Sequence, residues 1–217
     1  MYKYKMLLLF LGLLLIFSKV NAFIKEAPLT GKVIYIDPGH GGVDPGAFYK
    51  DIYEEDINLE ISLKLKEKLE NEGAIIYLTR EGDYDLSNPK ASLRKKSDLS
   101  NRALTINNSN ADLYLSIHLN STTSSTWKGA QAFYDDINPK NKEIAEKFQK
   151  YFNKYLNSKR KAKEIKELYM YKRINIPGLL LEVGFISNPN ERYILQQNWY
   201  QEKLVNILSK CINDILL

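Results

Sequence analysis

Cysteine and histidine are scarce in this chain of 217 residues. The single cysteine, Cys211, excludes an internal disulfide framework and a cysteine-rich metal cluster. We expect it to be a small buried hydrophobe in the last helix. The only two histidines are His40 and His118, so any histidine chemistry must use them. Residues 30–217 contain no internal repeat and no low-complexity linker, and the length predicts one domain.

The chain also lacks a strong excess of charge once its N-terminus is set aside. There are 31 basic and 26 acidic residues, but residues 1–22 hold three of the lysines and no acid. The remaining residues therefore carry 28 bases and 26 acids. This balance does not indicate nucleic-acid binding, and we expect no nucleic-acid partner. With 44% hydrophobic and 26% charged residues, the composition also excludes a multi-span membrane protein and a fully disordered chain.

The N-terminal 22 residues have the pattern of a secretory signal peptide. A basic start is followed by the apolar run Met6–Phe17 and then by Val20-Asn21-Ala22. The apolar run is shorter than the ~20 residues needed to span a bilayer as a helix. An uncleaved membrane anchor and a buried core helix are the alternatives. The prediction is export across the cytoplasmic membrane, with membrane contact only through this segment if it stays uncleaved.

The rest of the chain reads as a short linker at 23–30 and one folded domain at 31–217. Short apolar runs predict strands at residues 32–37, 74–79, 112–117, 129–134 and 178–183. Amphipathic spacing predicts helices at residues 54–72, 92–108, 138–156 and 199–217. The alternation predicts an α/β fold. We expect a mostly parallel twisted sheet of about five or six strands with helices on both faces.

Three of the predicted strands end beside a distinctive polar residue, namely His40, His118 and Glu182. Ligands of open α/β sheets bind at the carboxyl ends of the strands, so these side chains are expected to converge. Glu54, at the start of a helix, is expected near the same edge. Two imidazoles and one carboxylate with an open position form a standard donor set for catalytic zinc. A further glutamate that is not a ligand can transfer protons.

The sequence pattern is also compatible with purely structural roles for His118 and Glu182. The spacing of the four residues matches no short zinc motif. His118 could equally be a hydrogen-bonded core histidine. A carboxylate in the apolar strand around Glu182 is unfavourable unless it is paired or bound to a metal. A purely structural Glu182 would therefore need an arginine or lysine partner, and Arg80 or Arg173 could be that partner.

The chain resembles the zinc-dependent N-acetylmuramoyl-L-alanine amidases, the peptidoglycan amidase family called type 3. The resemblance covers residues 31–217 and rests on six motifs that occur in order. They are Ile36-Asp37-Pro38-Gly39-His40-Gly41-Gly42, Glu54-Glu55-Asp56-Ile57-Asn58-Leu59, Leu78-Thr79-Arg80, Ser97–Arg102, Ser116-Ile117-His118-Leu119-Asn120-Ser121 and Leu181-Glu182-Val183-Gly184-Phe185-Ile186-Ser187-Asn188-Pro189.

This resemblance implies that His40, Glu54 and His118 bind Zn²⁺ and that Glu182 is the catalytic glutamate. Glu54 matches the family position better than Glu55, because it stands four residues before Asn58. The implied reaction is hydrolysis of the amide between the lactyl group of muramic acid and L-Ala. Zinc would polarise the carbonyl, and Glu182 would carry a proton from water to the departing amine.

The compact layout looks like that of the germination-specific cortex amidases of spore-forming bacteria. It implies peptidoglycan as substrate, in the cell wall or the spore cortex, and a role in muramic-δ-lactam formation. The resemblance also implies a protein activator as a partner. The alternatives are a catalytically inactive peptidoglycan-binding or scaffold protein and a zinc hydrolase of another cell-wall bond.

Charge is concentrated in residues 140–173, which hold 12 bases and 4 acids. This segment is either a solvated helix face or a surface for an anionic wall polymer or a protein partner. The loop at residues 120–128 is rich in Ser and Thr and contains Trp127. It is either a wall of the glycan groove or a solvent-exposed loop.

Overall fold

The computed structural model describes residues 27–217. The predicted signal peptide at residues 1–22 lies outside this range. Within the described part of the chain, no helix combines the length and apolarity needed to cross a membrane.

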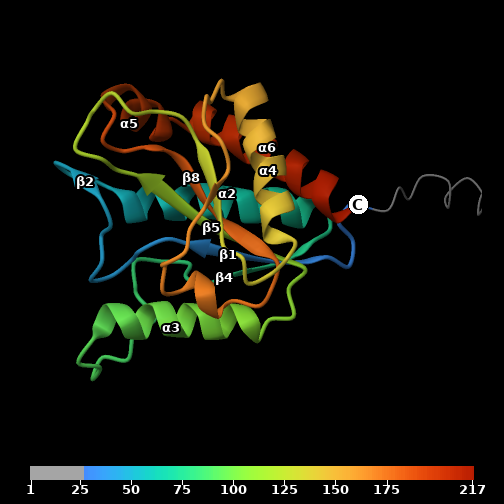
Figure 1. Cartoon of the computed structure of the whole chain (residues 1–217), viewed down its shortest axis with the longest axis horizontal. Helices are drawn as coiled ribbons and strands as arrows, with labels where there is room; N and C mark the ends of the chain where they lie inside the picture. The colour runs from blue at the N-terminus through green and yellow to red at the C-terminus, as the bar shows by residue number, and fades with distance from the viewer. Residues whose placement is uncertain (1–26) are drawn as a thin grey trace, which may run out of the picture.

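A six-stranded sheet forms the centre of the domain (Figure 1). Its spatial order is β4 (Ile75–Leu78), β1 (Val33–Pro38), β5 (Leu113–Asn120), β8 (Gly178–Phe185), β6 (Gln131–Tyr134) and β7 (Lys163–Glu164). The first four strands are mutually parallel, β6 is antiparallel to β8, and β7 is parallel to β6. The predicted α/β fold with a mostly parallel sheet is confirmed.

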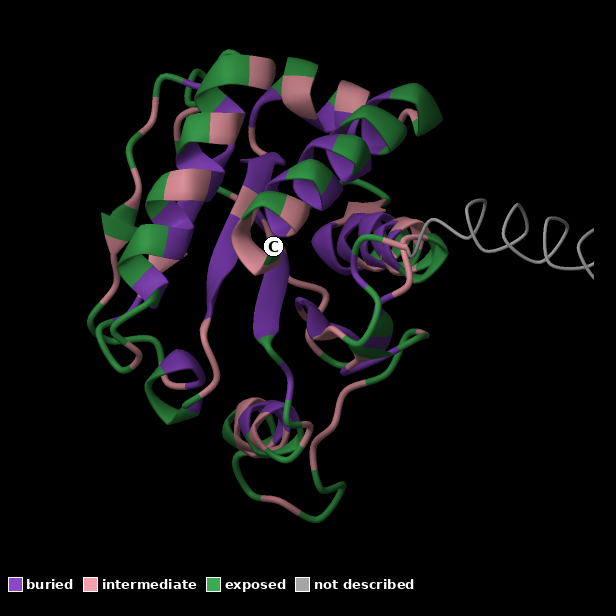
Figure 2. Ribbon diagram, turned by 90° about the vertical axis from the view of Figure 1, so that its right-hand side faces the viewer, coloured by how far each residue is buried: buried purple, intermediate pink, exposed green. Residues whose placement is uncertain are grey.

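Helices cover both faces of this sheet (Figures 1 and 2). One face packs against α2 (Glu54–Asn71), α4 (Asn141–Tyr155) and α6 (Asn198–Leu216). The other face packs against α3 (Arg94–Asn107) and the short 3₁₀ helix η1 (Tyr171–Arg173). In Figure 2 the buried sides of these helices face the strands.

Helix α2 shows how the sequence pattern produces this packing. Ile57, Ile61, Leu65 and Leu69 recur every four residues and are all buried against the sheet. Burial of each such side chain contributes roughly 1.5–3 kcal/mol. The helix is followed by Gly73, whose φ of +92° suits glycine and turns the chain toward β4. The first residue of α2, Glu54, is thereby held at the edge where β1 and β5 end.

Four features were not predicted from the sequence. They are the hairpin of β2 (Phe48–Tyr49) and β3 (Ile52–Tyr53), the edge strand β7, the 3₁₀ helix η1, and α5 (Pro189–Leu195). Helix α5 does carry a start signal, because Asn188 caps it by accepting from the backbone N–H groups of Asn190 and Glu191, and proline occupies its first turn. The two-residue strands are too short to have a readable period.

Candidate functional site

The ends of β1 and β5 bring the two histidines together. Their rings lie edge to face with centroids 4.8 Å apart. A Cβ atom on Gly39 would lie 2.2 Å from the ring of His118, so only glycine fits between them. His40 adopts a φ of +64°, a left-handed conformation that turns its side chain away from the strand direction.

His40, Glu54 and His118 form a compact group that we call the metal cluster. Oε1 of Glu54 lies 3.2 Å from Nε2 of His40 and 3.0 Å from Nδ1 of His118. One donor atom from each of the three residues lies within 4.8 Å of the others. The structure thus brings together all three residues that the sequence singled out as ligands.

Backbone and side-chain contacts fix the Glu54 carboxylate in this position. Oε1 also accepts from the backbone N–H of Leu119 at 3.0 Å, and Oε2 accepts from that of Ala47 at 2.9 Å. Asn58, one turn further along α2, lies 3.3 Å from Oε1. Gly46 leaves room for the group, because a Cβ atom there would lie 2.7 Å from Oε2.

Glu55 is placed differently from Glu54. It is buried, its Oε2 has no hydrogen-bond partner in the described structure, and it is not part of the metal cluster. Burial and the nearby carboxylates of Asp83 and Asp56 raise the pKa of Glu55 to about 7. The geometry therefore favours Glu54 over Glu55 beside the histidines.

The pKa values of His40 and Glu54 in the metal cluster are strongly shifted. Burial lowers the pKa of His40, but its contacts with Asp44 and Glu54 outweigh burial and raise that pKa to about 9. Burial likewise opposes ionisation of Glu54, yet the two imidazoles hold its pKa well below the usual range. The cluster thus favours positive charge next to the Glu54 carboxylate, supplied either by protons or by a cation.

Glu182 lies beside the cluster on the adjacent strand. It is in register with His118 across the β5–β8 pair. Its Oε2 is buried and has no hydrogen-bond partner among the described residues. Burial, followed by repulsion from Glu54, raises the pKa of Glu182 to about 8, against a smaller opposing effect of His40.

The two arginines that could have paired with a structural Glu182, Arg80 and Arg173, make other contacts. Arg80 donates to backbone carbonyls of the His40 loop, and Arg173 stacks on the ring of Tyr169. Neither forms an ion pair with Glu182. Glu182 therefore has no paired cation to offset the burial of its Oε2.

The cluster fits a divalent cation by its donor chemistry. Two imidazole nitrogens and a carboxylate oxygen face one another, and the unsatisfied Glu182 oxygen belongs to the neighbouring strand. Asp44 contacts the other ring nitrogen of His40 at 3.2 Å, which is the arrangement that orients a ligating histidine. A cavity of about 260 Å³, lined in part by His40, His118 and Glu182, opens next to these groups.

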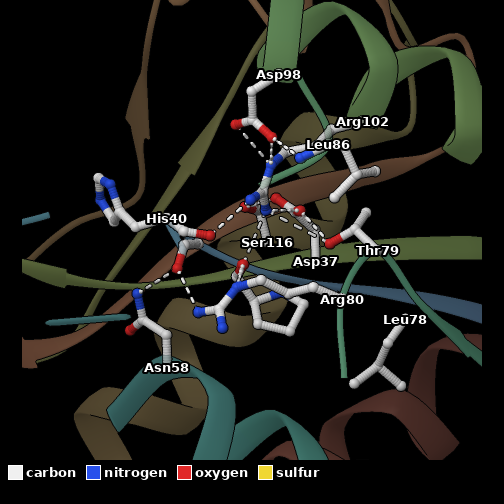
Figure 3. A network of polar contacts seen from close by, with 12 residues as sticks. Asp37, His40, Asn58, Leu78, Thr79, Arg80, Leu86, Asp98, Arg102 and Ser116 are labelled. Atoms are coloured by element: carbon white, nitrogen blue, oxygen red, sulfur yellow. Dashed lines mark hydrogen bonds and ion pairs between the residues drawn. The ribbon is translucent and has the colours of Figure 1, made fainter. Parts of the chain in front are cut away.

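Two buried arginines, Arg102 and Arg80, hold the backbone around His40 (Figure 3). Arg102 pairs with Asp37 at 2.8 Å and with Asp98 at 2.9 Å, and it donates to the carbonyl of His40 at 2.5 Å. Arg80 donates to the carbonyls of Pro38 and Gly39. Both arginines lie in motifs quoted above. Asp98 and Arg102 are four residues apart on α3, but the contacts with Pro38 and Asp37 join residues about 40–65 apart, and no local pattern reveals those.

The two remaining sequence expectations concern Cys211 and Trp127. Cys211 is buried in α6 and packs in the main hydrophobic cluster, as predicted. Trp127 is 54% exposed, in a loop that follows β5, and carries Arg160 over its ring.

Comparisons with known proteins point to one family. A family model described as N-acetylmuramoyl-L-alanine amidase matches residues 34–214. The germination-specific N-acetylmuramoyl-L-alanine amidase of Bacillus subtilis is 43% identical over 190 residues, which are 85% of this chain and 80% of that protein.

Solved structures of amidases are also similar to this chain. That of the CwlD amidase from Clostridioides difficile, in complex with the GerS lipoprotein, superposes with a TM-score of 0.81 at 38% identity and covers 86% of this chain and 98% of that one. The catalytic domain of CwlV from Bacillus (Paenibacillus) polymyxa gives a TM-score of 0.74 at 28% identity, with 85% and 98% covered.

Proposed function

The chain belongs to the N-acetylmuramoyl-L-alanine amidase family and is an amidase, and we propose that it works with a zinc ion held by His40, Glu54 and His118. The substrate is the amide between the lactyl group of muramic acid and the L-Ala of the stem peptide. The observation that carries this proposal is the convergence of two imidazole nitrogens and one carboxylate oxygen, next to a glutamate on the adjacent strand whose buried Oε2 has no partner among the described residues.

Each side chain then has a defined task. When bound, zinc supplies Lewis-acid polarisation of the scissile carbonyl and lowers the pKa of water. Glu182 accepts a proton on its carboxylate from the attacking water and passes it to the departing amine of L-Ala. Asp44 holds the ring of His40, and Asn58 and the backbone of Leu119 hold Glu54. The arginines behind the loop keep the histidine backbone in place, so the site is preorganised.

The biological setting follows from the relatives. Peptidoglycan lies outside the cytoplasmic membrane, and the Bacillus subtilis relative is a germination-specific amidase. We assign the chain to the spore cortex, where peptide removal precedes muramic-δ-lactam formation. Export through the predicted signal peptide at 1–22 is part of this proposal, with 23–30 as the linker and 31–217 as the catalytic domain. N-terminal sequencing of the exported protein tests the cleavage site.

A protein partner is also part of the proposal. The CwlD amidase of similar structure was solved with a lipoprotein bound. We expect this chain to have an activating partner as well, because it shares 38% identity and nearly the whole domain with that amidase.

The test is to incubate the purified protein with isolated peptidoglycan, with and without zinc, and to identify the products. An amidase releases intact stem peptides with a free L-Ala amine and leaves the glycan acetylated. Cleavage within the peptide or loss of acetyl groups would identify a hydrolase of another wall bond. Absence of any product from zinc-loaded protein, with the partner present, would identify an inactive binding protein.

A further inference from the structure

A second cavity lies at the same edge of the sheet as the metal cluster. It has a volume of about 600 Å³ and is lined by four cationic side chains. They are Lys128, Lys159, Arg160 and Lys161. We call this feature the basic cavity.

Strand register fixes where the basic cavity lies relative to Glu182. Gln131, at the start of β6, lines the cavity and is in register with Glu182 on β8. The side chain of Gln131 donates to the carbonyl of Lys161, just before β7, at 2.9 Å. Because neighbouring strands lie ~4.8 Å apart, Lys161 is about two strand spacings, or roughly 10 Å, from Glu182.

Arg160 is the most firmly held of the four cations. Its guanidinium lies 4.8 Å from the ring centre of Trp127 and 4.6 Å from that of Phe185. Nε donates to the carbonyl of Lys128, and Nη1 lies 3.3 Å from Oε1 of Gln131. Nη2 has no hydrogen-bond partner among the described residues. Stacking and hydrogen bonds therefore hold a guanidinium with a free donor edge, which suits a carboxylate.

The charges of the basic cavity are unpaired, unlike those on the other side of the metal cluster. Within residues 27–217, none of its four cations forms an ion pair. The only acid lining it, Glu191, accepts from the backbone N–H groups of Gly129 and Phe185. On the other side, Asp44 pairs with Lys95 and Asp85 pairs with Arg94. Positive potential is thus available on the β6–β7 side, where it would attract an anion.

We propose that the basic cavity binds the carboxylates of the stem peptide while its first amide lies at the metal cluster. This inference rests on the proposed function and identifies the part of the substrate that binds on the β6–β7 side of the metal cluster. An extended peptide advances about 3.3–3.6 Å per residue, so about three residues span the distance from Glu182 to Lys161. A peptide attached through L-Ala ends in a free carboxyl group, which this span brings to the basic cavity, where Arg160 and the three lysines can bind it.

Charge reversal tests the inference. The double variant Lys159→Glu/Lys161→Glu changes two exposed lysines of the cavity and leaves the hydrogen bonds of the Arg160 side chain in place. Its matched control is Lys142→Glu/Lys150→Glu, the same change in charge on the exposed side of α4, outside the cavity lining. All proteins are full-length, and circular dichroism checks that each is folded.

Two measurements compare two forms of one tripeptide that begins with L-Ala, a form with free carboxylates and a form with carboxamides. Calorimetry measures binding of the free tripeptides, and kinetics with their N-acetylmuramoyl derivatives gives KM and kcat. Wild type and the control should prefer the carboxylate form on the order of tenfold in Kd and KM, as expected for charge-assisted hydrogen bonds. The cavity variant should lose this preference.

The outcomes separate this inference from the proposed function. Equal binding of both tripeptides by the wild type, or an undiminished preference in the cavity variant, would overturn the inference even if peptides are released from peptidoglycan. Loss of binding to whole peptidoglycan in the cavity variant, with the tripeptide preference intact, would assign the cations to a wall polymer and also overturn it. A carboxylate preference without any peptide release would instead contradict the proposed function.

Discussion

Two polar clusters meet at the end of β1, and they differ in whether their hydrogen-bonding and charged groups have partners. In the arginine cluster of Arg102, Asp37 and Asp98, every charged group has a partner of opposite sign (Figure 3). In the metal cluster and its neighbour Glu182, carboxylate and imidazole groups crowd together and Oε2 of Glu182 has no partner in the described structure. The first cluster is closed and structural, whereas the second is arranged for something that binds to it.

The largest expected effect on activity comes from a change in the metal cluster. His118→Ala should abolish both zinc binding and amidase activity, because it removes one of three donors. The fold should remain, since His118 is partly exposed and contributes little apolar burial. Elemental analysis, an activity assay and circular dichroism measure the three properties. Full zinc occupancy in the folded variant would show that His118 is not a ligand.

Breaking the arginine cluster should lower the stability of the fold. Arg102→Met leaves Asp37 and Asp98 without their cation, and Asp37 is 1% exposed. Removing one partner of a buried ion pair costs about 3–5 kcal/mol. We expect a loss of that size in the free energy of unfolding, measured by urea denaturation.

The control for Arg102→Met is Lys66→Met, which breaks a surface ion pair with Glu81 at 2.6 Å. Surface pairs contribute about 0–1 kcal/mol, so this variant should change little. Equal losses for the two variants would remove the distinction between a closed buried cluster and an ordinary surface pair.

Acid should reduce the stability that the arginine cluster contributes, because it protonates Asp37. Burial opposes ionisation of this carboxyl, but Arg102 and the hydroxyl groups of Ser116 and Thr79 keep its pKa below the ordinary value. The stabilisation is therefore present above the unfolded pKa of about 3.9 and is lost as the pH falls toward the folded pKa. Urea unfolding from neutral to acidic pH should show a shallower decline for Asp37→Asn than for wild type. Parallel declines would show that Asp37 does not contribute to acid sensitivity.

Much of the fold and of the metal cluster could be predicted, because short stretches of sequence indicate the helices and strands that place these residues. The four-residue spacing of Ile57 to Leu69 indicates a helix, and the apolar run before His118 indicates a buried strand. Parallel strands end at one edge, so residues placed just after them must meet. The pairing of Arg102 with Asp37 could not be predicted, because the two residues are 65 positions apart and neither belongs to a periodic pattern. The direction of β6 depends on its pairing with β8, and no residue within β6 specifies it.

The central claim is that the metal cluster binds zinc while Glu182 transfers the proton. The variant Glu182→Gln tests this claim most directly. Zinc content and release of stem peptides from peptidoglycan should be measured on the same preparation of wild type and variant. We predict equal zinc content and a loss of activity on the order of 10²–10⁴-fold, the usual contribution of general acid–base catalysis. Peptide release at the wild-type rate by the folded, zinc-loaded variant would contradict the account.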